Sequence, residues 1–259
     1  MSHTAAALIT LAAFAQVAPA IGGVTIQSQQ RTLSVATSAN GATQTLSAPG
    51  FGPFVETLAI DAPFQSPTGS LTNGAAGRID CQIDPNSVRA RGAFTVAGGA
   101  NITGGSEIGD AKCDIRVTFV VSDPTPFAIM ATPRPTLLAT DAYEIKLRDE
   151  TRHNDLVEVN QATPAQQVGL QGVLQPGTYF VRFSAETASD GSEATREFAF
   201  NISLGCRADF DGSGTLSTQD ILDFVAAWFD NDLRADVDLQ GGVGIVDIFA
   251  FLQMWFAGC

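Results

Sequence analysis

The last fifth of the chain contains one short pattern twice, and this repeat limits what the chain can fold into more than any other feature. The segment 209–229 can be laid over the segment 236–256 with a shift of 27 residues, and eight of the 21 positions are then identical. The identical pairs are Asp209 and Asp236, Asp211 and Asp238, Gly214 and Gly241, Asp220 and Asp247, Ile221 and Ile248, Phe224 and Phe251, Trp228 and Trp255, and Phe229 and Phe256. Such a repeat predicts one supersecondary unit that is used twice.

Each copy begins with oxygen-bearing groups at alternating positions. Ca²⁺ is held by loops of about 12 residues that offer oxygen ligands from the first, third, fifth, seventh, ninth and last positions. In the first copy the ligands would be Asp209, Asp211, Ser213, the Thr215 carbonyl, Ser217 (directly or through water) and Asp220. In the second copy they would be Asp236, Asp238, Gln240, the Gly242 carbonyl, a water near Gly244, and Asp247. The sixth position, where the loop turns sharply, is glycine in both copies. We therefore predict two Ca²⁺ sites; the alternative is that the aspartates only cap two helices.

Apolar residues follow each loop with helical spacing. The two stripes, at positions i, i+3, i+4 and i+7, are Ile221, Phe224, Val225 and Trp228, and then Ile248, Phe251, Leu252 and Trp255. This spacing predicts a helix with one apolar face after each loop. No helical pattern precedes either loop, so the units lack the entering helix of a full EF-hand.

The paired loops and stripes resemble the type I dockerin module of bacterial extracellular complexes. The resemblance covers about 50 residues, 206–259, and includes the Asp that closes each loop. The chain end, residues 256–259, resembles the GC-type dockerin variant, which stops at Gly-Cys. The resemblance implies a small all-α module with two calcium loop–helix repeats. Ser213 and Gln240 stand where dockerins usually have Asp or Asn, which implies weaker calcium binding.

Dockerins bind a cohesin-like protein receptor and read it through the tenth and eleventh loop positions. Here these positions are Thr218 and Gln219 in the first copy, and Ile245 and Val246 in the second, in place of the common Ser-Thr pair. The resemblance therefore implies partner-binding residues at these four positions. Because dockerins occur on polysaccharide-degrading machinery, it also implies a role in polysaccharide degradation or binding.

The chain is acidic, and the charge is concentrated near its end. The net charge is −13, and the residues from Cys206 onward contribute −7, from nine Asp and two Arg. No basic run is present, and phosphate contacts require basic patches. This composition excludes nucleic acid as a partner on electrostatic grounds.

Residues 1–20 are typical of a secretory signal peptide. An apolar core is followed by Ala18-Pro19-Ala20, which places small residues before a cut at Ile21. A membrane anchor is the alternative, but the apolar run is short for a span. We expect a secreted protein, extracellular or at the cell surface, with no membrane span in the mature chain.

Four cysteines fit export to an oxidising compartment, and they allow three pairings. We favour Cys81–Cys113, which would close a loop within the large domain, and Cys206–Cys259, which would join the ends of the C-terminal module. Closing the second loop, of about 50 residues, would stabilise the module by about 4 kcal/mol in the chain-entropy model. The alternative for Cys259 is a terminal attachment chemistry.

The chain between residues 21 and 204 has the pattern of β-structure. Short runs alternate apolar and polar residues and are separated by Gly, Pro, Ser, Thr and Asn. We expect strands at 31–35, 54–60, 87–96, 114–120, 143–147, 156–159, 178–183 and 197–202. This spacing predicts an antiparallel β sandwich or jelly roll. The expected organisation is multidomain: a signal peptide at 1–20, a β-sandwich domain of unknown ligand at 21–204, and the dockerin-like module at 206–259.

No residue is predicted to be catalytic. His153, the single histidine after residue 20, lies in an expected turn, and no nucleophile-elbow motif is present. A glycosidase would need a pair of carboxylates, but acidic residues on strands are more typical of a solvated sheet face. The acidic residues considered are Glu56, Glu107, Asp110, Glu144, Glu158 and Glu186. Both Trp lie in the helical stripes, so the sandwich lacks a flat platform for crystalline sugar. A groove that binds single glycan chains through polar groups stays open.

Three hypotheses for function follow. The leading one is a secreted, non-catalytic β-sandwich protein anchored by the calcium-dependent module to a cohesin-type receptor, with polysaccharide as a further partner. The second is a glycan-active hydrolase whose site lies in the sandwich. The third is a surface adhesin or matrix protein in which calcium only rigidifies the chain.

Overall fold

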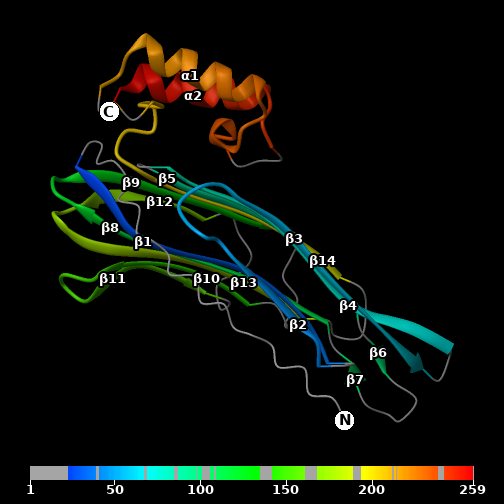
Figure 1. Ribbon diagram of the computed structural model, residues 1–259. Coiled ribbons are helices and arrows are strands. Elements are labelled where there is room, and N and C mark those ends of the chain that lie inside the picture. Colours follow the sequence, from blue (N-terminus) through cyan, green and yellow to red (C-terminus); the bar gives the residue numbers. More distant parts are fainter. Residues whose placement is uncertain are drawn as a thin grey trace.

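The computed structural model describes residues 23–38, 41–66, 69–84, 87–97, 99–100, 106–107, 109–134, 142–160, 168–188, 194–211, 213, 215–238 and 242–258. Figure 1 shows two long, twisted sheets face to face, with two C-terminal helices above one of them. The predicted signal peptide at 1–20 lies outside the described residues, as do Gly214, Gln240, Gly241 and Cys259. What is predicted for them stays a prediction.

The described strands form two six-stranded antiparallel sheets, which we name sheet A and sheet B. Sheet A has the order β11 (Asn154–Asn160), β10 (Ala142–Asp149), β13 (Gly177–Ala188), β8 (Gly109–Val121), β1 (Val24–Thr37) and β2 (Thr43–Ser47). Sheet B has the order β12 (Val168–Leu174), β9 (Thr125–Arg134), β14 (Ala194–Leu204), β5 (Ser87–Ala97), β4 (Gly69–Asp84) and β3 (Phe54–Ser66). The short strands β6 (Gly99–Ala100) and β7 (Ser106–Glu107) pair separately. The predicted antiparallel sandwich is confirmed.

Alternating side chains from both sheets fill one core between them. In β8 every second side chain is buried along the whole strand, and Ile115, Val117 and Phe119 face inward. Phe183 of sheet A and Phe198 of sheet B meet across the core, with ring centroids 5.2 Å apart. Aromatic pairs at this distance stabilise a core beyond the area that they bury. The period-2 pattern of the sequence therefore decides which face of each sheet becomes the core.

All eight predicted strands lie within observed strands, but alternation alone does not predict β2, β4, β9 and β12. Glycines in β4 and prolines in β9 are typical of turns, which hides these strands in the sequence. Close packing explains one of the glycines. Gly77 of β4 is buried, and a Cβ there would lie 2.9 Å from Leu33 Cδ1 of the opposite sheet.

The predicted Cys81–Cys113 disulfide is not formed in the structure, because both residues are free thiols. Cys81 lies in β4 of sheet B and Cys113 in β8 of sheet A, so a bond between them would join the two sheets through the core. Burial raises the pKa of the Cys81 thiol to about 11 and also raises the pKa of Cys113. Buried, protonated thiols behave as small apolar side chains. The pairing of Cys206 with Cys259 stays a prediction.

We expect both core thiols to be unreactive in the folded protein. Because burial excludes the reagent and keeps the thiols protonated, iodoacetamide at about pH 8 should modify neither Cys81 nor Cys113 until the chain is unfolded in guanidinium. Peptide mass spectrometry without reduction measures this. Recovery of a peptide in which these two cysteines are linked would contradict the observed free thiols.

Candidate functional site

The C-terminal module begins after Gly205, whose positive φ of 90° suits glycine and turns the chain away from β14. It contains α1 (Thr218–Phe229), the short 3₁₀ helix η1 (Leu233–Ala235) and α2 (Ile245–Ala257). Each α-helix follows one of the two repeat loops, as the apolar spacing predicts. No helix of the described residues is long and apolar enough to cross a membrane.

The two helices pack through equivalent residues of the repeat. Phe224 of α1 and Phe251 of α2 stack with ring centroids 4.1 Å apart and ring planes within 2° of each other. Phe210 sets its edge against both rings, at 5.6 and 5.9 Å. Both stacked rings are fully buried, so the identical Phe of each copy forms the centre of the module.

Two tryptophans tie each helix to the start of the other. The indole Nε1 of Trp228 in α1 donates to the carbonyl of Gly244, the N-cap of α2, at 2.7 Å. In return, Nε1 of Trp255 in α2 donates to the carbonyl of Ser217, the N-cap of α1, at 3.2 Å. This reciprocal pair shows that the helices lie antiparallel, with the two copies related by a local pseudo-twofold.

The predicted aspartate ligands converge into two clusters. In the first, one carboxylate oxygen each of Asp209, Asp211 and Asp220 lies within 4.8 Å of the others, and the second cluster joins the equivalent residues Asp236, Asp238 and Asp247 in the same way. The first and last members of each cluster are buried. Like charges held this close repel unless a cation or hydrogen bonds compensate them.

The Asp that closes each loop makes the same three hydrogen bonds in both copies. Oδ1 of Asp220 accepts from the N–H groups of Phe210 (2.8 Å) and Asp211 (3.2 Å), and Oδ2 accepts from Ser217 N–H at 2.7 Å. Each of these residues lies at the start of the loop or at the helix N-cap. The structure therefore bears out the capping interpretation of this residue while also bringing it into the acidic cluster.

The second copy repeats this arrangement atom for atom. Oδ1 of Asp247 accepts from the N–H groups of Val237 (2.7 Å) and Asp238 (3.1 Å), and Oδ2 accepts from Gly244 N–H at 2.8 Å. An identical set of contacts in two copies indicates that the sequence repeat is a repeat of local structure.

The other predicted ligands are distributed less uniformly. Ser213 Oγ lies 3.5 Å from Asp209 Oδ1 and donates to the Thr215 carbonyl at 3.1 Å, so both groups adjoin the first cluster. A hydrogen bond from Ser213 N–H lowers the pKa of Asp211. Ser217, by contrast, uses its hydroxyl as the helix cap, where it accepts from Gln219 N–H. In the second loop, Gly242 has a φ of 100°, a conformation that favours glycine.

A cation from the sandwich contacts the second cluster, and the sequence pattern does not predict this contact. Arg91 of β5 places its Nη2 3.4 Å from Oδ2 of the buried Asp236. A Cβ on Gly242 would lie 3.3 Å from Arg91 Nη1, so the guanidinium stands beside the loop. Arg207 further connects the two parts of the chain, with Nη2 donating to the Val237 carbonyl at 2.9 Å and Nη1 lying 3.4 Å from Met130 Sδ. Arg91 and Asp236 are far apart in the sequence, so no local sequence pattern could predict their contact.

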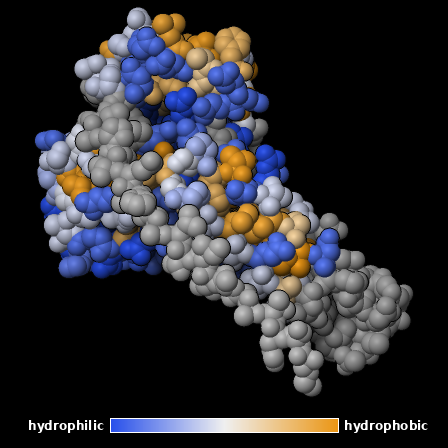
Figure 2. Space-filling view, viewed as in Figure 1, coloured by the Kyte–Doolittle hydropathy of each residue, from blue (hydrophilic) through white to orange (hydrophobic). Residues whose placement is uncertain are grey.

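Large apolar side chains are exposed on the helices. They are Leu222, Phe229, Ile245, Val246, Phe249 and Phe256, each more than half exposed. We call this set the exposed apolar face. Figure 2 shows hydrophobic residues on the part of the module that points away from the sandwich. Two of the predicted partner-binding residues, Ile245 and Val246, belong to the set, and the other two, Thr218 and Gln219, are also exposed.

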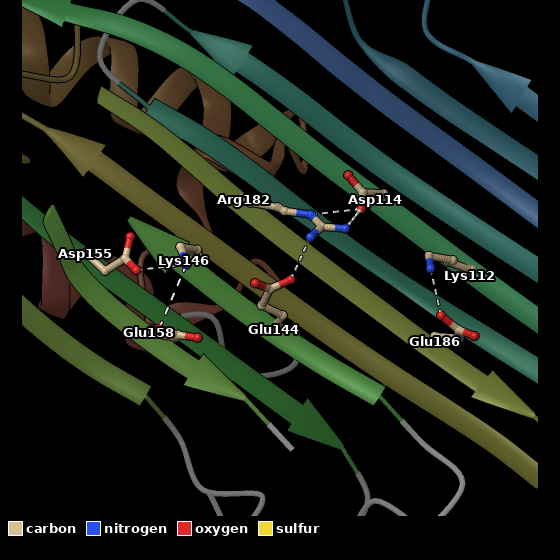
Figure 3. Close-up of polar contacts among 8 residues, drawn as sticks. All are labelled: Lys112, Asp114, Glu144, Lys146, Asp155, Glu158, Arg182 and Glu186. Atoms are coloured by element: carbon tan, nitrogen blue, oxygen red, sulfur yellow. Dashed lines mark hydrogen bonds and ion pairs between the residues drawn. The ribbon is translucent and has the colours of Figure 1, made fainter. Parts of the chain in front are cut away.

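Three carboxylates considered for a glycosidase site are engaged in ion pairs on the outer face of sheet A (Figure 3). Glu144 pairs with Arg182 at 2.8 Å, Glu186 pairs with Lys112 at 2.8 Å, and Glu158 lies 3.9 Å from Lys146 Nζ. His153 lies in an exposed turn with a positive φ of 53°. These ion pairs match the solvated-face interpretation of the three carboxylates.

No protein-family model matches the chain, and no curated protein matches it. Among solved structures, a TmCBM61 structure in complex with β-1,4-galactotriose aligns with a TM-score of 0.28 and 8% identity, over 49% of this chain and 86% of that one. A structure of carbohydrate-binding modules from the β-sandwich superfamily aligns with a TM-score of 0.25 and 9% identity, over 73% of this chain and 96% of that one. A structure of the infectious bursal disease virus Gx strain aligns with a TM-score of 0.27 and 7% identity, over 76% of this chain and 60% of that one. Scores this low assign neither a family nor a function.

The reciprocal tryptophan hydrogen bonds should stabilise the module. Trp228→Phe and Trp255→Phe keep a ring but remove the indole donor, so each should lower the free energy of unfolding of the module by about 1–2 kcal/mol. Urea denaturation followed by the helical circular-dichroism signal measures this. The control is Leu222→Ala, an exposed change expected to stay within about 0.5 kcal/mol. Midpoints equal to that of the control would mean that the hydrogen bonds do not hold the helices together.

Proposed function

We propose that the chain is a secreted, non-catalytic β-sandwich protein whose C-terminal module docks, in a calcium-dependent manner, to a cohesin-type receptor, with a polysaccharide as a further partner. The observation that carries this proposal is the repeated carboxylate cluster, in which the same three positions of each copy converge to within 4.8 Å. Clusters of partly buried carboxylates are costly without a cation, and their repetition argues against a chance arrangement.

The donor set fits Ca²⁺, which is a hard cation that takes oxygen ligands. The residues that would hold the two ions are Asp209, Asp211, Asp220 and the Thr215 carbonyl in the first loop, and Asp236, Asp238 and Asp247 in the second. A bound ion would neutralise the clustered charge and order the loop around it.

The chain's own hydrogen bonds would couple the loops to the helices. Asp220 bonds both the start of its loop and the N-cap of α1, and Asp247 does the same for α2. Any change that orders a loop therefore also fixes where its helix begins. The position of the exposed apolar face would in this way depend on the state of both loops.

The exposed apolar face is the surface that we assign to the receptor. Phe229 and Phe256 are 76% and 77% exposed, and they are equivalent residues of the two copies. Exposed apolar residues gathered on one small module are typical of protein-binding surfaces. Because the copies are related by a pseudo-twofold, the face presents similar groups from both helices.

Removing one carboxylate from each cluster should weaken calcium binding without unfolding the module. Asp211→Asn and Asp238→Asn keep the side-chain shape and leave the loop-closing aspartates in place. Each should lower the Ca²⁺ affinity of its own loop by about tenfold or more, because ligand charge sets affinity in such loops. Isothermal titration of the full chain with Ca²⁺, reversed with EGTA, measures this.

The matched control is Asp230→Asn, which removes the same charge from the exposed C-cap of α1, outside both clusters. Equal weakening by this control would reduce the effect to general electrostatics. Absence of Ca²⁺ binding by the unmodified chain would overturn the calcium part of the proposal and leave the aspartates as helix caps.

The exposed apolar face should be needed for docking but not for calcium. Val246→Asp together with Phe249→Asp places charges on this face, so binding to purified cohesin-type domains should fall by about a hundredfold or more, while the Ca²⁺ titration is unchanged. Leu170→Ala, an exposed apolar position of β12, is the control. Surface-based binding measurements with and without EGTA provide the readout. Docking that persists in EGTA, or in the double variant, would contradict the assignment.

A further inference from the structure

The outer face of sheet A carries an open groove, and no residue of the C-terminal module is among those that line it. Strands β1, β8, β13 and β10 form its floor, and its volume is about 610 Å³. Four cations and two carboxylates line it, together with Gln30 and Phe180. Four cations against two carboxylates give the lining itself a formal charge of +2, in a chain whose net charge is −13.

Three of the cations stand in one row across the floor. Arg116 of β8 is in register with Arg182 of β13, which is in register with Lys146 of β10. Like charges directly opposite each other on neighbouring strands destabilise a sheet. Stability alone therefore does not favour this row.

Carboxylates compensate two of the three cations (Figure 3). Arg182 donates to Asp114 Oδ2 from Nε and Nη2, at 3.0 and 2.5 Å, and to Glu144 Oε2 from Nη1 at 2.8 Å. Lys146 Nζ lies 2.9 Å from Asp155 Oδ2. These pairs fix the two side chains against the sheet and use hydrogen-bond donors of both.

Arg116, the third cation, has no ion pair among the residues that the structure describes. Its guanidinium lies over the ring of Phe180, with Cζ 4.2 Å from the ring centroid, and the residue is exposed. Stacking of this kind holds the guanidinium plane while its N–H edge stays available. A guanidinium edge matches a carboxylate, with which it forms two parallel hydrogen bonds.

Among the described residues that line the groove, Phe180 alone is aromatic, and the Arg116 guanidinium lies over its ring. A neutral sugar ring therefore finds no free aromatic face, and a ligand must be held by charge and hydrogen bonds. We infer that this groove binds a glycan chain that carries carboxylate groups, with Arg116 pairing with a uronate carboxylate and Gln30 bonding to a neighbouring hydroxyl. The inference rests on the proposed polysaccharide partner and names its class and its place.

The test uses the full chain and two defined probes, tetragalacturonate and tetramannuronate, measured by isothermal titration. Each is compared with the same tetramer after reduction of its carboxylates to neutral alcohols. EGTA is present throughout, because uronates bind Ca²⁺ themselves and the groove requires no metal. At least one acidic tetramer should bind, and its neutral counterpart should bind at least about tenfold more weakly.

Arg116→Gln should lower the affinity for the acidic tetramer by about tenfold or more. Arg78→Gln is the matched control, since Arg78 is an exposed arginine of β4 on the other sheet, and it should change the affinity by less than about twofold. Unchanged thermal unfolding of both variants verifies that neither loses its fold. Equal losses in the two variants, or no loss in Arg116→Gln, would overturn the inference.

The neutral tetramers separate this inference from the proposed function. If acidic and neutral tetramers bind equally, or only neutral ones bind, the polysaccharide partner stands and the carboxylate assignment fails. If no tetramer binds, both the assignment and the polysaccharide partner fail, while calcium-dependent docking is decided by its own titrations.

Discussion

The module depends on the two carboxylates that close its loops, Asp220 and Asp247. Each bonds two consecutive N–H groups at the start of a loop and a third at a helix N-cap. Hydrogen bonds to an ionised carboxylate are among the stronger ones in proteins. The loop and its helix therefore form one unit. Helix capping and membership of an acidic cluster are not competing interpretations here, since the same side chain serves both.

The tryptophans extend this coupling from one copy to the other. Trp255 of α2 bonds the carbonyl of Ser217, and the N–H of Ser217 is one of the donors to Asp220. Trp228 makes the equivalent link through Gly244 to Asp247. Two hydrogen bonds therefore connect each loop-closing aspartate, through a helix N-cap, to the tryptophan near the end of the opposite helix. The identical Trp of the repeat is explained by this role, which the helical spacing alone describes only as part of an apolar stripe.

Local patterns predict the parts of the structure that local interactions decide. Alternation identifies eight strands, and the spacing of Asp and apolar residues identifies both helices and the convergence of the carboxylates. Contacts between distant segments have no such signal. Arg91 and Asp236 meet only because the module lies against sheet B, and Cys81 and Cys113 lie on opposite sheets because the fold places their strands there. The glycines of β4 suggest a turn in the sequence for the same reason. The side chain that leaves no room for a Cβ at Gly77 belongs to Leu33, which lies on the opposite sheet.

Charge is used differently in the two parts of the chain. The module gathers carboxylates without enough cations of its own, and Arg91 of the sandwich supplies one to Asp236. Sheet A instead gathers cations and surrounds most of them with carboxylates. Partly exposed ion pairs contribute little to stability, so the main effect of this network is to fix side chains in place. With Arg182 already bonded to Asp114 and Glu144, Arg116 is the cation of the row whose hydrogen-bond donors are left for a ligand.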